Sequence, residues 1–287
     1  MATNAQEKSV DDSSPALVLV PGKRRSVQGL RHLKGAWPEV IARIRDADHR
    51  ILFLDFDGTL VGLRRHPDDV RFSERGRKIL RRLVGRENLT VAVVSGRELE
   101  KIQTLVGVEG IRYVGLHGAE RAGETTVPSI AARQMVEAAL KSAQTGLAGL
   151  RGIEIEDKHL SFAVHYRGAR QAATEAASRV VGDIVTTSND KLRILCGKKV
   201  WEVLPREFPG KGVAALELFA RLPEKKIAIY FGDDETDEEA FSVLPGQITV
   251  NVGSGVNSHA SFYVQSPSEV LQFLSRLENE LELEKEL

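Results

Sequence analysis

The chain has 287 residues, 42% of them hydrophobic and 28% charged, which suits a globular protein with one large or two modest domains. Its 40 basic residues balance its 40 acidic residues, so no net field favours nucleic acid or an anionic membrane. The single cysteine, Cys196, excludes an intrachain disulfide, and no apolar run approaches the roughly 18 residues that span a bilayer. We therefore expect a cytoplasmic protein without nucleic-acid or membrane partners, and a monomer.

Residues 1–35 are mostly polar and predict a flexible N-terminal segment. Helical spacing of apolar residues begins at Ala36, and the continuous apolar run 51–54 then predicts a strand buried on both faces, as in a parallel sheet. Asp55 and Asp57 follow that strand. If the chain is still extended at Asp55, both carboxylates start from one face and can converge on one ion or phosphoryl group. The alternative is that Asp57-Gly58 is only a turn.

Alternating strands and helices continue up to about residue 122. The pattern predicts helices at 73–83, with Ser73 as the cap, and at 98–106, and strands at 89–94 and 113–116. Ser95 and His117 stand at the exits of these two strands. Repeated strand and helix is the signature of a doubly wound sheet.

The pattern changes between residues 123 and 204. Helical segments at 130–150 and 169–181 and alternating, half-exposed strands predict an inserted α+β domain; the strands are 153–156, 160–166, 192–195 and 200–204. The first pattern then resumes, with a helix at 211–222, a buried strand at 227–231 that leads into Gly232–Asp237, a strand at 248–252 and a helix from Ser268. We therefore predict an α/β fold, a Rossmann-like doubly wound parallel sheet formed by residues 36–122 and 205–287. The leucine stripe of the last helix fits packing on this domain, or a coiled-coil partner.

Polar residues at the strand exits are expected to meet at one edge of the sheet: Asp55, Asp57, Ser95, Asp233 and Asp237, with Lys211 at a helix start. Clustered carboxylates repel one another unless a cation lies among them, and hard oxygen ligands favour Mg²⁺. A lysine beside such a cluster suits a phosphate. A nucleotide-binding P-loop is excluded, because Pro205 and Gly212 stand where that motif needs glycine and Ser or Thr.

These residues resemble the haloacid dehalogenase (HAD) superfamily of phosphatases. Four motifs of that superfamily occur here in the same order: Asp-x-Asp-Gly-Thr at 55–59, Ser95, Lys211, and Gly-Asp-Asp-x-x-Asp at 232–237. More narrowly, the chain is similar to the trehalose-6-phosphate phosphatase family over residues 36–280. The stretches that resemble that family's motifs are Ser95-Gly96-Arg97, Gly115-Leu116-His117-Gly118, His165-Tyr166-Arg167, Lys211-Gly212 and Gly232–Glu238. The resemblance implies hydrolysis of trehalose 6-phosphate, the last step of trehalose biosynthesis, and makes the inserted domain a cap that recognises the substrate.

The resemblance also implies a role for each core residue. Asp55 would be the nucleophile, Asp57 the general acid and base, and Ser95 and Lys211 the phosphoryl ligands. Mg²⁺ would be held by Asp55, Asp233 and the main-chain carbonyl of Asp57. Asp234 or Asp237 would ligate through water or orient Lys211.

Substrate contacts are expected from both domains. By resemblance, the candidates are Gly96, Arg97, Glu156, Lys158, Arg167, Lys198 and Glu202. Charged residues on an exposed sheet face are also commonly just solvated. His165 is expected to pack, and His117 to shape a loop.

Three functions compete on this evidence. The first is trehalose-6-phosphate phosphatase. The second is a phosphatase of another sugar phosphate, such as sucrose 6-phosphate or a mannosyl compound. The third is a non-catalytic sugar-phosphate sensor, against which the intact Asp55, Asp57, Lys211 and Asp233 argue.

Overall fold

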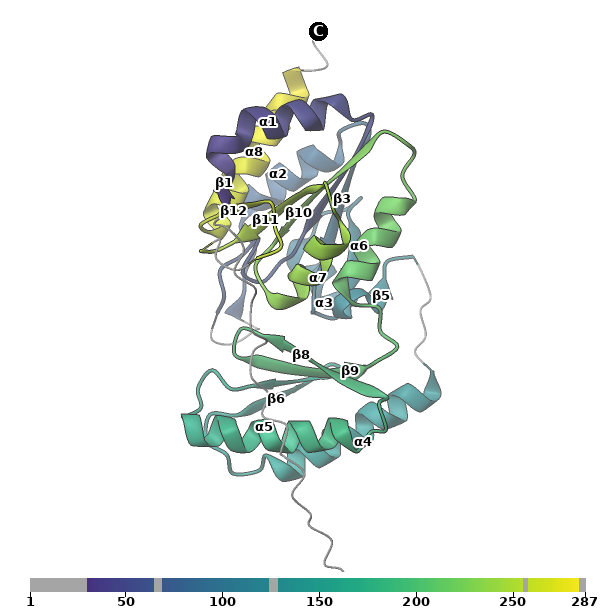
Figure 1. Ribbon diagram of the computed structural model, residues 1–287, viewed down its shortest axis with the longest axis vertical. Coiled ribbons are helices and arrows are strands. Elements are labelled where there is room, and N and C mark those ends of the chain that lie inside the picture. Colours follow the sequence, from purple (N-terminus) through teal and green to yellow (C-terminus); the bar gives the residue numbers. More distant parts are fainter. Residues whose placement is uncertain (1–29, 65–68, 124–128, 255–257, 284–287) are drawn as a thin grey trace, which may run out of the picture.

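The computed structural model describes residues 30–64, 69–123, 129–254 and 258–283, which form two packed units (Figure 1). Most of the predicted N-terminal segment, residues 1–29, lies outside these ranges. No helix in the described ranges is both long and apolar enough to cross a bilayer.

The larger unit is built on an eight-stranded sheet, counted over the described residues, in which β5 alone runs antiparallel to its neighbour. The strand order is β1-β12-β11-β10-β2-β3-β4-β5. The strands are β1 (Arg31–His32), β2 (His49–Leu54), β3 (Leu89–Val94), β4 (Arg112–Gly115), β5 (Glu120–Arg121), β10 (Lys226–Gly232), β11 (Ile248–Val252) and β12 (Phe262–Val264).

The order reverses between β2 and β10. From β2 the chain moves outward through β3 and β4, and after the second unit it returns at β10 and moves the other way. Such a switch point opens a crevice at the carboxyl ends of the strands.

Helices cover both faces of this sheet (Figure 1). In β2, Leu52 and Leu54 join the core beneath α1, α2, α3 and α8, whereas Ile51 and Phe53 join the core beneath α6 and α7. The helices are α1 (Leu33–Asp46), α2 (Glu74–Val84), α3 (Leu99–Val106), α6 (Gly210–Ala220), α7 (Glu235–Val243) and α8 (Pro267–Leu283). Burial on both faces explains the unbroken apolar run of β2.

The smaller unit is an antiparallel sheet of order β6-β7-β9-β8, with two helices on its far face (Figure 1). Its elements are α4 (Ile130–Gly146), β6 (Glu154–Asp157), β7 (Phe162–His165), α5 (Gln171–Thr186), β8 (Leu192–Gly197) and β9 (Val200–Pro205). Phe162, Trp201 and Val203 pack against the helices. The other face of this sheet turns toward the larger unit, and Leu160, Leu195 and Leu204 pack on Leu116 and Ala119 there. We call the two units the cap and the core.

The predicted fold class is confirmed, with three strands and one α-helix added to the predicted list. Strands β1, β5 and β12 and helix α7 were not predicted. Residues 30–35 were assigned to the flexible segment, but β1 pairs with β12 and Leu33 is buried, so these residues belong to the core sheet and to α1. In α8, Leu274, Leu277 and Leu281 are buried in the core, as packing on the parent domain requires.

Candidate active site

Strand exits bring the first polar residues together. Asp55 follows β2, Ser95 follows β3, and Asp233 follows β10. The Asp55 amide donates to the Phe231 carbonyl at 2.9 Å, so the two acidic exits lie at the switch point.

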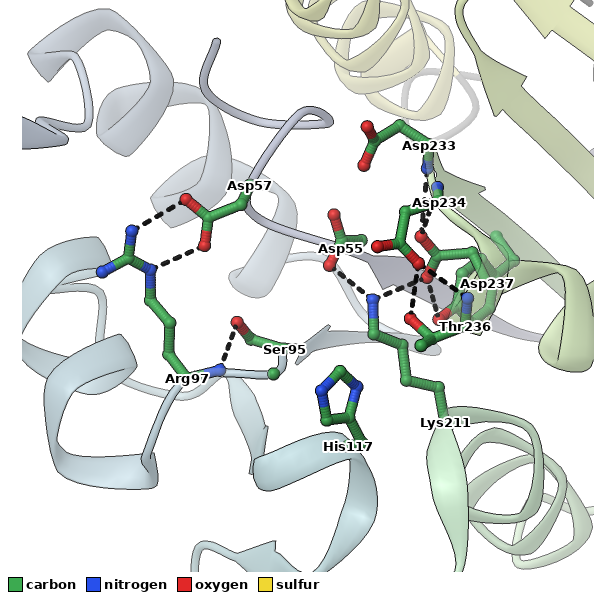
Figure 2. A network of polar contacts seen from close by, with 12 residues as sticks. Asp55, Asp57, Ser95, Arg97, His117, Lys211, Asp233, Asp234, Thr236 and Asp237 are labelled. Carbon is green, nitrogen blue, oxygen red and sulfur yellow. Dashed lines mark hydrogen bonds and ion pairs between the residues drawn. The ribbon is translucent and has the colours of Figure 1, made fainter. Parts of the chain in front are cut away.

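Lys211 joins this edge from the start of α6. Its Nζ donates to Asp55 Oδ1 at 2.8 Å and to Asp237 Oδ1 at 2.9 Å (Figure 2). Burial alone would lower the pKa of Lys211, but Asp237 and Asp55 outweigh it and raise the pKa well above the usual value. The lysine therefore stays an ammonium in a buried place.

Of the two residues Asp234 and Asp237, it is Asp237 that contacts Lys211. The hydroxyl of Tyr230 donates to Asp237 Oδ1 at 3.0 Å, and the amides of Asp233 and Asp234 donate to Oδ2 at 3.0 and 3.2 Å. Asp234 instead caps α7 by accepting from the Thr236 amide at 2.6 Å. Asp237 orients Lys211, and Asp234 begins a helix.

The carboxylates fit a hard cation. Ligand atoms of Asp55, Asp233 and Asp237 lie within 4.8 Å of one another, and the buried Asp233 Oδ1 has no hydrogen-bond partner among the described residues. Burial, together with the neighbouring Asp234 and Asp237, raises the pKa of Asp233 to about 7. Lys198 lowers this pKa, but by a smaller amount. Burial also raises the pKa of Asp55. A divalent cation would offset the repulsion among these carboxylates, and all-oxygen ligands suit Mg²⁺.

Gly58 allows the backbone after Asp57 to lie against the Asp233 carboxylate. Its φ is +90°, and a Cβ there would collide with the Asp233 carboxylate. Only glycine permits both the left-handed backbone and the close approach. The Asp57-Gly58 turn is therefore part of the site, and the next strand, β3, pairs parallel to β2, which excludes a hairpin.

Asp55 and Asp57 do not converge as expected. Strand β2 ends at Leu54, so the alternation that would place both carboxylates on one face is lost before Asp55. Asp57 turns to Arg97, whose Nε and Nη2 donate to it at 2.6 and 2.8 Å (Figure 2). Ser95 Oγ accepts from the Arg97 amide at 3.1 Å. Arg97, predicted to contact substrate, holds the predicted acid and base in this arrangement.

The cap brings further polar side chains over this edge. Lys198, in the turn between β8 and β9, donates to Asp233 Oδ2. Arg167 donates to the Lys198 carbonyl at 3.1 Å. Glu156 lies 3.0 Å from His165 Nε2, and although burial opposes it, His165 and Lys158 lower the pKa of Glu156. His165 therefore pairs with a carboxylate rather than only packing.

Glu202 and Lys158 lie in a buried network. Lys158 Nζ donates to Glu202 Oε2 at 2.7 Å and to the Gly96 carbonyl at 3.0 Å. The Ser161 hydroxyl donates to Glu202 Oε1 at 2.8 Å, and His117 Nε2 lies 3.1 Å from Oε2. The network joins cap to core.

A cleft of about 250 Å³ separates the two units. Its lining includes the four predicted catalytic residues and the seven predicted substrate contacts, together with Asp233, Asp234, His117 and His165; Asp237 is buried behind them. The sequence did not predict the contact of His117 with Glu202 or that of Tyr230 with Asp237. His117 gave the same signal as Ser95, a polar residue at a strand exit, whereas Tyr230 gave none because an aromatic residue within a strand is ordinary.

Comparison with known proteins gives the same family. The family model for trehalose-phosphatase matches residues 53–271. Trehalose-phosphate phosphatase B of Arabidopsis thaliana is 30% identical over an alignment of 251 residues, with 79% of this chain and 66% of that protein covered. Probable trehalose-phosphate phosphatase 3 of Oryza sativa subsp. japonica is 30% identical over 274 residues, with 84% and 73% covered.

A solved structure gives the same fold. The C-terminal domain of Candida albicans trehalose-6-phosphate phosphatase superposes with a TM-score of 0.78 at 21% identity, covering 87% of this chain and 99% of that one. The core and cap are thus those of the HAD fold, in line with the matched family model. The chain belongs to the trehalose-phosphatase family.

Proposed function

We propose that the protein is a Mg²⁺-dependent phosphatase that hydrolyses trehalose 6-phosphate to trehalose and phosphate. The observation that most favours it is the buried pairing of Asp55 with Lys211 on the floor of a cleft roofed by polar cap side chains. A carboxylate and an ammonium at that place suit attack on a phosphate, and a polar roof suits a sugar.

In the first step, an Asp55 oxygen attacks phosphorus and the bond from phosphorus to the sugar oxygen breaks. Asp57 gives a proton to the departing oxygen, which leaves trehalose and an aspartyl phosphate. Lys211 and Ser95 hold the phosphoryl oxygens, and Asp237 and Tyr230 keep Lys211 in place.

In the second step, water attacks phosphorus while Asp57 takes its proton. Phosphate leaves and the Asp55 carboxylate is restored. Asp55, Asp233 and the main-chain carbonyl of Asp57 would hold Mg²⁺, which supplies charge that offsets the phosphate. Arg97 orients Asp57 through its two hydrogen bonds.

The cap residues are proposed to bind the disaccharide. Sugar hydroxyls need paired donors and acceptors, which Glu156, Lys158, Arg167, Lys198 and Glu202 supply. All five line the cleft. Domain limits of 36–122 and 205–287 for the core and 123–204 for the cap are part of this proposal, with β1 and the start of α1 added to the core.

Phosphate release from a panel of substrates tests the proposal. The panel holds trehalose 6-phosphate, sucrose 6-phosphate, a mannosyl phosphate, glucose 6-phosphate and a small aryl phosphate, each with Mg²⁺ or EDTA. We expect fastest turnover of trehalose 6-phosphate, loss of activity in EDTA, and a loss of about a thousandfold or more in Asp55→Asn, because an amide is not a nucleophile. Asp48→Asn, an exposed surface change, is the matched control and should leave activity unchanged.

Other outcomes would rule out this mechanism or favour another of the candidate functions. Full activity in EDTA or in Asp55→Asn would rule out the mechanism. Faster release from another sugar phosphate would favour the second candidate. Binding without any hydrolysis would favour the sensor.

A further inference from the structure

One core histidine reaches the cap. His117 lies in the short 3₁₀ turn η2 (Leu116–Gly118) after β4, is only 7% exposed, and has Nε2 3.1 Å from Glu202 Oε2 on β9. A carboxylate only accepts hydrogen bonds, so Nε2 must bear the proton and donate it. The contact is therefore a directed hydrogen bond across the boundary between the two units.

The histidine ring has little freedom. A Cβ at Gly96 would lie 2.5 Å from His117 Nε2, so the ring packs directly on the Gly96 backbone. Nδ1 is buried with no partner among the described residues. The hydrogen bond from Nε2 to Glu202 is thus the polar contact of this ring in the described structure.

Glu202 keeps one acceptor site for a ligand. A carboxylate offers about four acceptor sites. Lys158 and His117 use the two on Oε2, and Ser161 uses one on Oε1, which leaves one on Oε1. Although burial opposes it, Lys158 and His117 hold the pKa of Glu202 well below its usual value, so the group is a charged acceptor.

We propose that His117 is a positioning residue for sugar selection, because its Nε2–H fixes the Glu202 carboxylate at the cleft only when the cap is docked on the core. The inference rests on the proposed function and deepens it. Among the described residues, the hydrogen bond of His117 goes to Glu202 and not to Asp55. Because of this contact, Glu202 is positioned to bind a sugar hydroxyl only when the cap is docked on the core. The disaccharide is therefore recognised in the same arrangement that brings its phosphate to Asp55.

A matched pair of substitutions tests this. His117 and His159 both have a left-handed backbone, with φ of 54° and 59°, and asparagine tolerates that region well. The Asn amide ends near the place of the histidine Nδ1 and does not reach Glu202. His117→Asn should lower kcat/KM for trehalose 6-phosphate about tenfold and change kcat/KM for a small aryl phosphate less than about twofold. His159→Asn, whose parent side chain is 82% exposed, should change neither.

A second pair separates the hydrogen bond from packing. Gln and Met are both unbranched and equally strained at this backbone, but only Gln has a donor near the place of Nε2. His117→Gln should restore the preference for trehalose 6-phosphate, and His117→Met should not. The two variants should share one melting temperature, which keeps the comparison valid if His117→Asn folds poorly.

Three results would overturn the inference. They are equal losses on both substrates, an unchanged preference in His117→Met, and a Gln variant no better than Met. If the wild type prefers another sugar phosphate of the panel, the proposed substrate is wrong, and the same ratio measured with that sugar phosphate still tests His117. If no sugar phosphate is hydrolysed, both proposals fail.

Discussion

At the scale of single residues, the Asp233 carboxyl group is strongly altered by its surroundings. It is 7% exposed, with Oδ1 unpartnered among the described residues and Oδ2 held by Lys198. Burial and the neighbouring Asp234 and Asp237 outweigh Lys198 and raise its pKa from 3.8 to about 7.

This shift makes the metal-free protein sensitive to pH. Between pH 3.8 and about 7 the folded protein holds a proton on Asp233 that the unfolded chain releases, so the free energy of unfolding falls as pH rises through that window. Asp233→Asn keeps a neutral group, so its melting temperature in EDTA should fall less. The two curves should agree near pH 4 and separate toward pH 8, with the wild type lower. Curves that stay parallel throughout would contradict the assignment.

At the scale of elements, the hairpin of β8 and β9 connects cap and core. Its turn brings Lys198 to Asp233, and a Cβ at Gly197 would lie 3.1 Å from Asp234 Oδ2. An ammonium at this carboxylate opposes the binding of a metal ion to the same carboxylate. The hairpin is therefore expected to link metal binding to the position of the cap.

Removing that ammonium should tighten metal binding. Lys198→Met keeps the length of the side chain and removes its charge, and we expect the dissociation constant for Mg²⁺, measured by calorimetry, to fall about tenfold, as the loss of one ion pair of ~1.4 kcal/mol implies. Lys199→Met is the control, since Lys199 lies over the Tyr166 ring and not at Asp233. Equal affinities in Lys198→Met and wild type would show that Lys198 does not compete for the site.

Element by element, the sequence predicts long regular segments well and short ones poorly. Strand β2 and helix α2 were predictable because continuous burial and a Ser73 cap are local features. Strands β1, β5 and β12 have two or three residues, too few to show a period. Helix α7 was missed because the acidic residues of Gly232–Asp237 were interpreted only as parts of the site, although Asp234 and Asp237 also form the capping box of this helix.

The site was predictable as a set of residues but not as a set of contacts. Strand exits and parallel pairing bring Asp55, Ser95 and Asp233 to one edge, and both are visible in the sequence pattern. Side-chain direction is not, because Asp57 turns to Arg97 once the strand has ended. The contact of His117 with Glu202 depends on how the cap docks, which no local pattern encodes.

At the scale of the whole molecule, the proposed chemistry and the proposed sugar recognition belong to different units. The core supplies Asp55, Lys211 and Asp233 at the switch point of a parallel sheet, and the cap supplies a polar roof across the cleft. An apolar cluster that includes Leu116 and Leu204 packs the cap on the core beside the buried Glu202 network. This division predicts that turnover and sugar preference can be changed separately.

The most direct test of that claim is the ratio of kcat/KM for trehalose 6-phosphate to kcat/KM for a small aryl phosphate, measured in wild type and in Arg167→Ala. Arg167 lines the cleft from the cap, and a hydrogen bond to a charged group is worth about 1.5 to 3 kcal/mol, so the ratio should fall roughly ten- to a hundredfold while aryl phosphate hydrolysis persists. Arg179→Ala, at an exposed position of α5 on the far face of the cap sheet, should leave the ratio unchanged. A ratio in Arg167→Ala equal to that of wild type, or equal losses on both substrates, would contradict the assignment of sugar recognition to the cap.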